Sequence, residues 1–227
     1  MANLYDTAQS AGVRSLETNK VLRNTYALLA VTLLFSALTA GISMAIGIPF
    51  GAALVMNIVA LGLLWFVLPR TAHSSTGVFV VFAFTGLLGA GLGPMLNAYV
   101  SYHGGGIVFQ ALAGTAIVFF TLSGYVLTTR KDFSFMGGFL MVGLVTVLLF
   151  AIGAMIAGFF GVDVSMVSLA ISGAIVLLMS GFILYDTSRI IHGGETNYLF
   201  ATASLYLNIL NLFTSLLHLL GAFSGDD

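Results

Sequence analysis

The stretch GGFLMVGLVTVLLFAIGAMIAGFF, residues 137–160, decides the fold class of this chain. It carries no charged residue, and a helix of about 20 such residues crosses the ~30 Å hydrocarbon layer of a bilayer. A strand of a membrane barrel would instead alternate apolar and polar residues over roughly 10 positions. Because lipid requires every backbone N–H and C=O to be paired internally, this stretch predicts a transmembrane α-helix.

The composition of the whole chain agrees with a lipid environment. Of its 227 residues, 59% are hydrophobic and 7% are charged, whereas a soluble domain carries roughly 25% charged residues to cover its surface. The net charge of −1, without a basic cluster, gives no indication of nucleic-acid binding. The chain has no cysteine, which excludes disulfides and thiolate chemistry.

Hydropathy windows predict an all-α integral membrane protein, a bundle of seven transmembrane helices. The predicted spans are Tyr26–Ile46, Ala52–Leu68, Val78–Asn97, Ile107–Leu127, Gly137–Phe160, Val164–Tyr185 and Tyr198–Ala222. We expect residues 1–22 to form a tail, residues 23–222 the membrane domain and residues 223–227 a short C-terminal tail. The first residues lack the apolar core of a cleavable signal peptide, so the first span is expected to remain as an uncleaved anchor.

The positive charges predict which way the spans run. All seven lysine and arginine residues lie before the first span or in the loops after even-numbered spans: Arg14, Lys20, Arg23, Arg70, Arg130, Lys131 and Arg189. The positive-inside rule therefore places the N-terminus and these loops in the cytoplasm and the C-terminus outside.

The third predicted span contains closely spaced small residues. Gly89 and Gly93 are separated by three residues, a spacing that lets helix backbones approach closely, and Pro94 removes one backbone hydrogen bond. Two interpretations remain open, tight helix packing and a hinge in a gate.

The last predicted span carries a polar stripe. Its members are Ser204, Asn208, Asn211, Ser215 and His218, whose spacing places them within a narrow arc of a helix. A polar stripe is unfavourable against lipid, so we expect this face to contact protein or water. The stripe either bonds to neighbouring helices or lines a conduction path.

Asp186 is expected at the cytoplasmic end of the sixth span. A carboxylate within a span normally has a partner or a function, although an ordinary helix-end carboxylate is an equally open interpretation. Arg189 at i+3 and Arg70 on the same membrane side are candidate partners. The histidines show no metal-ligand spacing, and no nucleophile motif, phosphate-binding loop or second acid on a span accompanies Asp186. We therefore expect neither enzymatic activity nor a cofactor.

Five segments of the chain carry a family resemblance: NKVLRNTYALL (19–29), FAFTGLLGAGLGPMLNAYVS (82–101), YVLTTRKDFSFMGG (125–138), YDTSRIIHGGETNY (185–198) and SLYLNILNLFTSLL (204–217). They resemble the Bax inhibitor family, and most closely its bacterial YccA branch. The resemblance implies a seven-helix bundle with the last helix at its centre, in the bacterial inner membrane. It also implies two functions within the family. Members of the YccA branch bind the membrane-anchored AAA protease FtsH and restrain it, whereas other relatives act as pH-sensitive calcium leaks.

The leak relatives use an Asp on span 6 that is bonded to an Asp on span 7, with an Arg of span 2 as a latch. By resemblance these positions match Asp186, Asn208 and, more loosely, Arg70. Asn208 therefore replaces the second carboxylate. Two close carboxylates share a proton, which an Asp–Asn pair does not do, and a single acid is a poor calcium ligand. Asp186 is thus only a weak calcium candidate.

Two functional hypotheses follow. The first is a regulatory protein that docks on an FtsH-type protease, with residues 1–20 as a cytoplasmic segment for the protease to engage; a tail without a role is the alternative for that segment. The second is a calcium or proton leak along span 7, weaker or differently gated than in relatives with two carboxylates.

Overall fold

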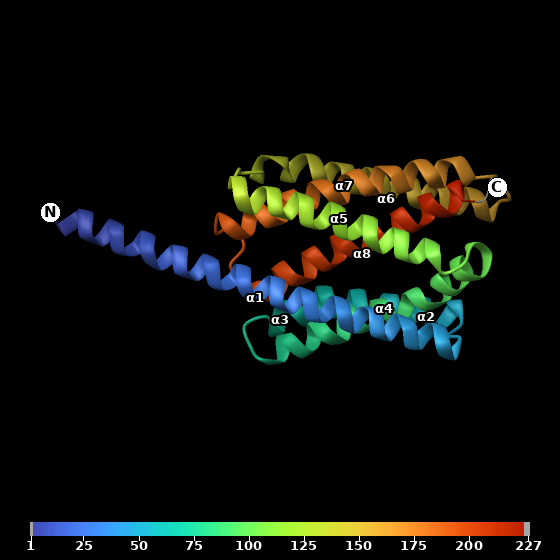
Figure 1. Ribbon diagram of the computed structural model, residues 1–227, viewed down its shortest axis with the longest axis horizontal. Coiled ribbons are helices and arrows are strands. Elements are labelled where there is room, and N and C mark those ends of the chain that lie inside the picture. Colours follow the sequence, from blue (N-terminus) through green and yellow to red (C-terminus); the bar gives the residue numbers. More distant parts are fainter. Residues whose placement is uncertain (1, 225–227) are drawn as a thin grey trace. The chain divides into compact units, whose positions relative to one another are not determined.

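The computed structural model describes residues 2–224, with side chains from Glu17 onward. The helices are α1 (Ala2–Ile46), α2 (Phe50–Gly62), a π-helical turn (Leu63–Val67), α3 (Leu68–Thr71), α4 (Thr76–His103), α5 (Gly106–Thr129), a 3₁₀ turn (Ser134–Met136), α6 (Gly137–Phe159), α7 (Ser165–Ile191) and α8 (Tyr198–Phe223). Figure 1 shows this order along the chain.

Within the described residues, seven helical segments are long and apolar enough to cross a membrane, which confirms the predicted number of spans. They are Glu17–Ile46, Phe50–Thr71, Thr76–His103, Gly106–Thr129, Ser134–Phe159, Ser165–Ile191 and Tyr198–Phe223. The short connection after α6 is a genuine turn, because Gly161 adopts a left-handed φ of 81° that lets the chain reverse at little steric cost.

Several spans are longer in the structure than the sequence predicted. Helix α7 continues through Asp186 to Ile191, and the second span continues through Pro69 and Arg70 to Thr71. Hydropathy falls at these polar residues, but backbone hydrogen bonding does not stop there. The π-helical turn lies just before Pro69, whose missing N–H interrupts the regular ladder. Helix α1 also runs without a break through residues 22 and 23, where the tail was expected to end.

The chain forms two compact units. The first comprises Met1–Met95 and Arg189–Tyr206, and therefore contains α1 to α3, most of α4 and the first part of α8. Tyr206 is fully buried in this unit; its hydroxyl lies 2.6 Å from Ser36 Oγ of α1 and donates to the carbonyl oxygen of Thr85 in α4 at 3.1 Å. The start of α8 is thus bonded to α1 and α4.

In the same unit α4 approaches α1 at two glycines. A Cβ atom added to Gly89 would overlap the backbone oxygen of Ser36, and one added to Gly93 would overlap the side chain of Ser43. Ser43 also donates a hydrogen bond to the carbonyl oxygen of Ala90 at 2.6 Å. This geometry supports close packing as the role of the two glycines, and α4 continues through Pro94 to His103.

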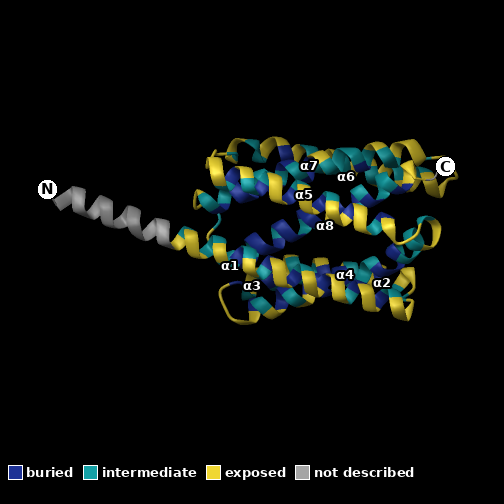
Figure 2. Ribbon diagram, viewed as in Figure 1, coloured by how far each residue is buried: buried dark blue, intermediate teal, exposed yellow. Residues whose placement is uncertain are grey.

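The second unit comprises Leu96–Ser188 and Leu207–Asp227. It contains α5, α6, nearly all of α7 and the second part of α8. Helices α6 and α7 pack closely, since Gly143 accommodates Leu178 and Gly181 accommodates Leu140. Burial is unequal: half of the membrane window of α8 is buried, as is half of that of α4, whereas only 6% of that of the fifth span is buried (Figure 2). The polar stripe pointed to α8 alone, and the equal burial of α4 was not foreseen.

Candidate functional site

The candidate site lies in the second unit, where α7 and α8 meet at Asp186 and Asn208. Both side chains are buried, each with 6% of its surface exposed. Asn208 Nδ2 donates a hydrogen bond to Asp186 Oδ2 at 2.8 Å. Asp186 was expected at a helix end, but α7 continues for a further turn beyond it, so the carboxylate is an interior residue of the helix.

The two residues after Asp186 are also polar and fully buried. The hydroxyl of Thr187 lies 3.4 Å from that of Ser123 in α5. Ser188 Oγ accepts a hydrogen bond from the backbone N–H of Phe133 at 2.9 Å, and it lies 3.3 Å from Asp132 Oδ1. A run of three polar residues on α7 therefore contacts α8, α5 and the loop that follows α5.

That loop carries two of the basic residues. Arg130 closes α5 in a left-handed conformation with a φ of 52°. Lys131 Nζ lies 5.6 Å from the centre of the Tyr125 ring, and its interaction with Tyr125 raises the pKa of this exposed lysine. Asp132 Oδ1 accepts a hydrogen bond from the N–H of Ser134 at 2.8 Å, which shapes the turn into α6.

The polar stripe of α8 does not face a single environment. Asn208 and Ser215 are buried, Ser204 and His218 are partly buried, and Asn211 is exposed. Asn211 Nδ2 donates to the carbonyl oxygen of Leu207 in its own helix at 2.9 Å. No neighbouring helix covers Asn211 in the described residues, so contact of the whole stripe with protein or water stays a prediction at this position. Helical spacing gives the stripe a common face but does not fix the width of the neighbouring surfaces.

His218 has a partner that the sequence did not indicate. Its Nδ1 lies 2.7 Å from Ser172 Oγ of α7. This contact joins α7 and α8 at a point farther along α8 than Asn208. Ser172 Oγ also donates to the carbonyl oxygen of Ser168 at 3.0 Å. Since a hydroxyl has one proton, these two contacts are satisfied together when His218 Nδ1 is the donor to Ser172.

The two basic residues proposed as partners of Asp186 have partners in the first unit. Arg70 donates a hydrogen bond to the carbonyl oxygen of Phe66 in its own span. Arg189 Nη2 lies 3.6 Å from Glu195 Oε2 and donates to the carbonyl oxygen of Gly194 at 3.2 Å. Among the described residues, no group of three or more His, Asp or Glu side chains is arranged to hold a metal ion.

Sequence reasoning missed the buried polar residues Tyr206, Ser36, Thr85, Ser123, Thr187, Ser188 and Ser172. Tyrosine was not counted in the polar stripe, and Thr187 and Ser188 fall in what was expected to be a loop. Their signal was present in the run YDTSR, where three consecutive polar residues follow an apolar span.

Seven apolar helices, two of them joined by a buried acid–amide pair, define a polytopic α-helical membrane protein. The chain matches the family model described as inhibitor of apoptosis-promoting Bax1 over residues 18–225, and it therefore belongs to the Bax inhibitor family.

Relatives at high identity cover nearly the whole chain. An uncharacterized membrane protein of Vibrio cholerae is 53% identical over 222 residues, which is 97% of each chain. The modulator of FtsH protease YccA of Escherichia coli (strain K12) is 51% identical over 211 residues, 93% of this chain and 94% of the relative. The same identity and coverage hold for the inner membrane protein YccA of a second E. coli strain. With its seven spans, the chain is a multi-pass protein of the bacterial inner membrane.

Proposed function

We propose that this protein docks on an FtsH-type membrane AAA protease and restrains its proteolysis of membrane proteins. The observation that carries the proposal is the 51% identity, over nearly the full length of both chains, to the E. coli protein named as a modulator of FtsH protease. The family and that name favour a regulatory role over a catalytic one.

The short loops and the long first helix restrict which surfaces are available for such docking. The loops between spans are short, so the available contact surfaces are the membrane faces of the helices and the N-terminal part of α1. Residues 2–16 extend α1 by roughly 20 Å beyond the first span, at about 1.5 Å per residue. The segregation of lysine and arginine supports a cytoplasmic position for this extension, on the side where an AAA protease has its ATPase domain.

Co-purification from native membranes tests the proposal. A C-terminally tagged full-length chain is solubilised in mild detergent, and the eluate is probed for the FtsH-type protease. A variant lacking residues 2–16 serves as the matched comparison, because it retains all seven spans. We expect the protease to co-purify with the full chain and to be lost or reduced with the shortened one.

The functional arm measures the lifetime of a membrane protein that the protease degrades. Raising the level of the full-length chain should lengthen that lifetime. Absence of the protease from the eluate, together with an unchanged substrate lifetime, would refute the proposal. Retention of the protease by the shortened chain would instead assign docking to the membrane helices.

A second candidate function is an ion leak beside α8, favoured by the buried Asp186–Asn208 pair. A carboxylate buried in a membrane protein is costly and commonly marks an ion or proton path. The amide at position 208 cannot share a proton with Asp186, so we propose a leak weaker than one built on two carboxylates.

Purified protein in liposomes tests this second function. Calcium and proton flux are measured between about pH 6 and pH 8 for the wild type, Asp186→Asn and Asn208→Leu. The leak hypothesis expects both substitutions to change flux. Wild-type flux equal to that of empty vesicles at every pH would reject it.

A further inference from the structure

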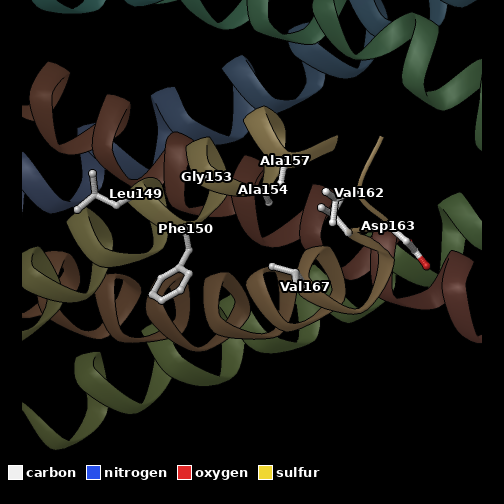
Figure 3. A pocket seen from close by; sticks show the side chains of 9 residues that line it. Leu149, Phe150, Gly153, Ala154, Ala157, Val162, Asp163 and Val167 are labelled. Carbon is white, nitrogen blue, oxygen red and sulfur yellow. The ribbon is translucent and has the colours of Figure 1, made fainter. Parts of the chain in front are cut away.

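A groove runs between α6 and α7 at the end of the bundle where these helices are joined. It has a volume of about 380 Å³ and is lined by residues of α6, of the turn and of the first part of α7. The groove is open on the α6 side because Gly153, Ala154 and Ala157 are small residues (Figure 3). A Cβ atom added to Gly153 would meet nothing within 4 Å, so the space directly beside Gly153 is open among the described residues.

One end of the groove is apolar and the other carries a charge. Leu149 and Phe150 lie at one end, and Asp163 lies at the opposite end, in the turn that follows α6 (Figure 3). Asp163 is the single ionisable residue among those that line the groove.

Asp163 is held in place as an ionised group. Its Oδ1 accepts hydrogen bonds from the Ser165 N–H at 2.9 Å and from the Ser165 hydroxyl at 2.6 Å. These bonds hold the pKa of this exposed carboxyl below its usual 3.8. The described residues place no hydrogen-bond donor on Oδ2, which leaves that oxygen for an external cation or donor.

The length of the groove along α6 fits within one leaflet of the bilayer. The lining residues from Leu149 to Ala157 span about 12 Å at ~1.5 Å per residue, which is less than half of a hydrocarbon layer of ~30 Å. An acyl chain of a lipid in one leaflet needs no more than this.

The charge at the mouth selects among lipid headgroups. The loop that carries Asp163, Gly161–Asp163, and the loop Ser101–Gly106 of the same unit contain no lysine or arginine. An anionic headgroup at this position would therefore lie beside a carboxylate, without a lysine or arginine of these loops to bind it. A headgroup with an ammonium group finds a complementary charge.

We propose that the groove binds a phospholipid with a primary-amine headgroup, with one acyl chain along α6 between Leu149 and Ala157 and the ammonium group beside Asp163. The site is separate from the Asp186–Asn208 pair and does not depend on the proposed function.

Lipid retention from membranes of known composition tests the site. The full-length protein is reconstituted in vesicles of equal parts phosphatidylethanolamine and phosphatidylglycerol, extracted in mild detergent, and its co-purified lipids are quantified by mass spectrometry. Asp163→Asn removes the charge but keeps an oxygen for the Ser165 bonds. Gly153→Leu fills the groove, and Gly124→Leu is its matched control on α5, because Gly124 also has open space around its Cβ position.

The wild type should retain phosphatidylethanolamine in excess. Asp163→Asn should lower its ratio to phosphatidylglycerol by about two- to fivefold, the range of an exposed ion pair. Gly153→Leu, or Ala157→Leu if the first variant does not fold, should reduce the total retained lipid while Gly124→Leu does not. Equal ratios in the wild type and Asp163→Asn overturn the headgroup assignment. Equal lipid retention by the groove-filling variant and the Gly124→Leu control overturns the groove as the site.

Discussion

Asn208 of α8 donates its side-chain amide to the carboxylate of Asp186 in α7 across 2.8 Å, and both residues are buried. This bond joins two spans in the second unit through one acid and one amide. An amide can donate to the carboxylate without competing for a proton, so the pair is a structural link whether or not ions pass beside it.

Removal of the Asn208 amide alone should lower the stability of the protein more than removal of both the amide and the Asp186 carboxylate. Asn208→Leu leaves the buried carboxylate without this donor, and we expect a loss of about 1–3 kcal/mol in the free energy of unfolding. The double variant Asp186→Leu/Asn208→Leu should recover part of that loss, because no buried carboxylate remains. Thermal unfolding in detergent measures both. Strictly additive losses would contradict the direct coupling of the pair.

Asn208→Asp should make the stability of the protein depend on pH differently from that of the wild type. Two carboxylates in hydrogen-bond contact retain a shared proton, so the folded variant binds a proton that the unfolded chain releases. By linkage its stability relative to the wild type should fall as the pH rises from about 6 to about 8. The melting temperatures of the two proteins across this range provide the measurement, and parallel pH profiles would argue against proton sharing.

Tyr206→Phe should weaken the first unit without creating a cavity. The substitution removes the hydroxyl that contacts Ser36 and the Thr85 carbonyl, and it keeps the ring that lies edge-on against Phe84. Hydrogen bonds between membrane helices contribute about 0.6 kcal/mol on average, so a loss of roughly 0.5–1.5 kcal/mol is expected. Ser36→Ala should add little to Tyr206→Phe in the double variant. Independent effects would show that the two hydroxyls do not act together.

Gly89→Ala should destabilise the protein through a steric clash. The new methyl group would overlap the backbone of Ser36 in α1, which cannot move as a flexible side chain would. Overpacking of this kind costs about 1–3 kcal/mol. Gly41→Ala is the matched control, because a Cβ atom at Gly41 meets nothing within 4 Å and alanine favours the helix. Equal melting temperatures for the two variants would mean that α1 and α4 are not closely packed at Gly89.

The lipid selectivity attributed to Asp163 should persist under mild acid. The Ser165 hydrogen bonds lower the pKa of this carboxyl from 3.8, so it remains ionised until the pH falls through that lowered value. Any stability that the ionised form contributes is present at higher pH and is lost only below that point. The ratio of retained lipids should therefore be the same at about pH 7 and about pH 5. A ratio that disappears by pH 5 would point to a different titrating group.

The sequence by itself determined the number of spans and the fold class. Long apolar runs are sufficient for this, because a bilayer requires each of them to form a helix and because the spacing of polar residues sets the helix faces. The ends of the helices were less accessible. Asp186 and Arg70 were assigned to span ends or loops since hydropathy falls at charged residues, whereas the backbone ladder continues past them.

Only the tertiary structure decided which polar residues meet. The Ser204–His218 stripe is regular in sequence, yet Asn208 bonds Asp186, His218 bonds Ser172 and Asn211 is exposed. The Tyr206–Ser36 contact likewise joins residues far apart in the chain. The groove beside Asp163 depends on how α6 and α7 pack. The physical reason is that one helix determines the direction of its own side chains, but not which helices pack against it. Small residues permit a close approach at some positions, as at Gly89, and leave open space at others, as at Gly153.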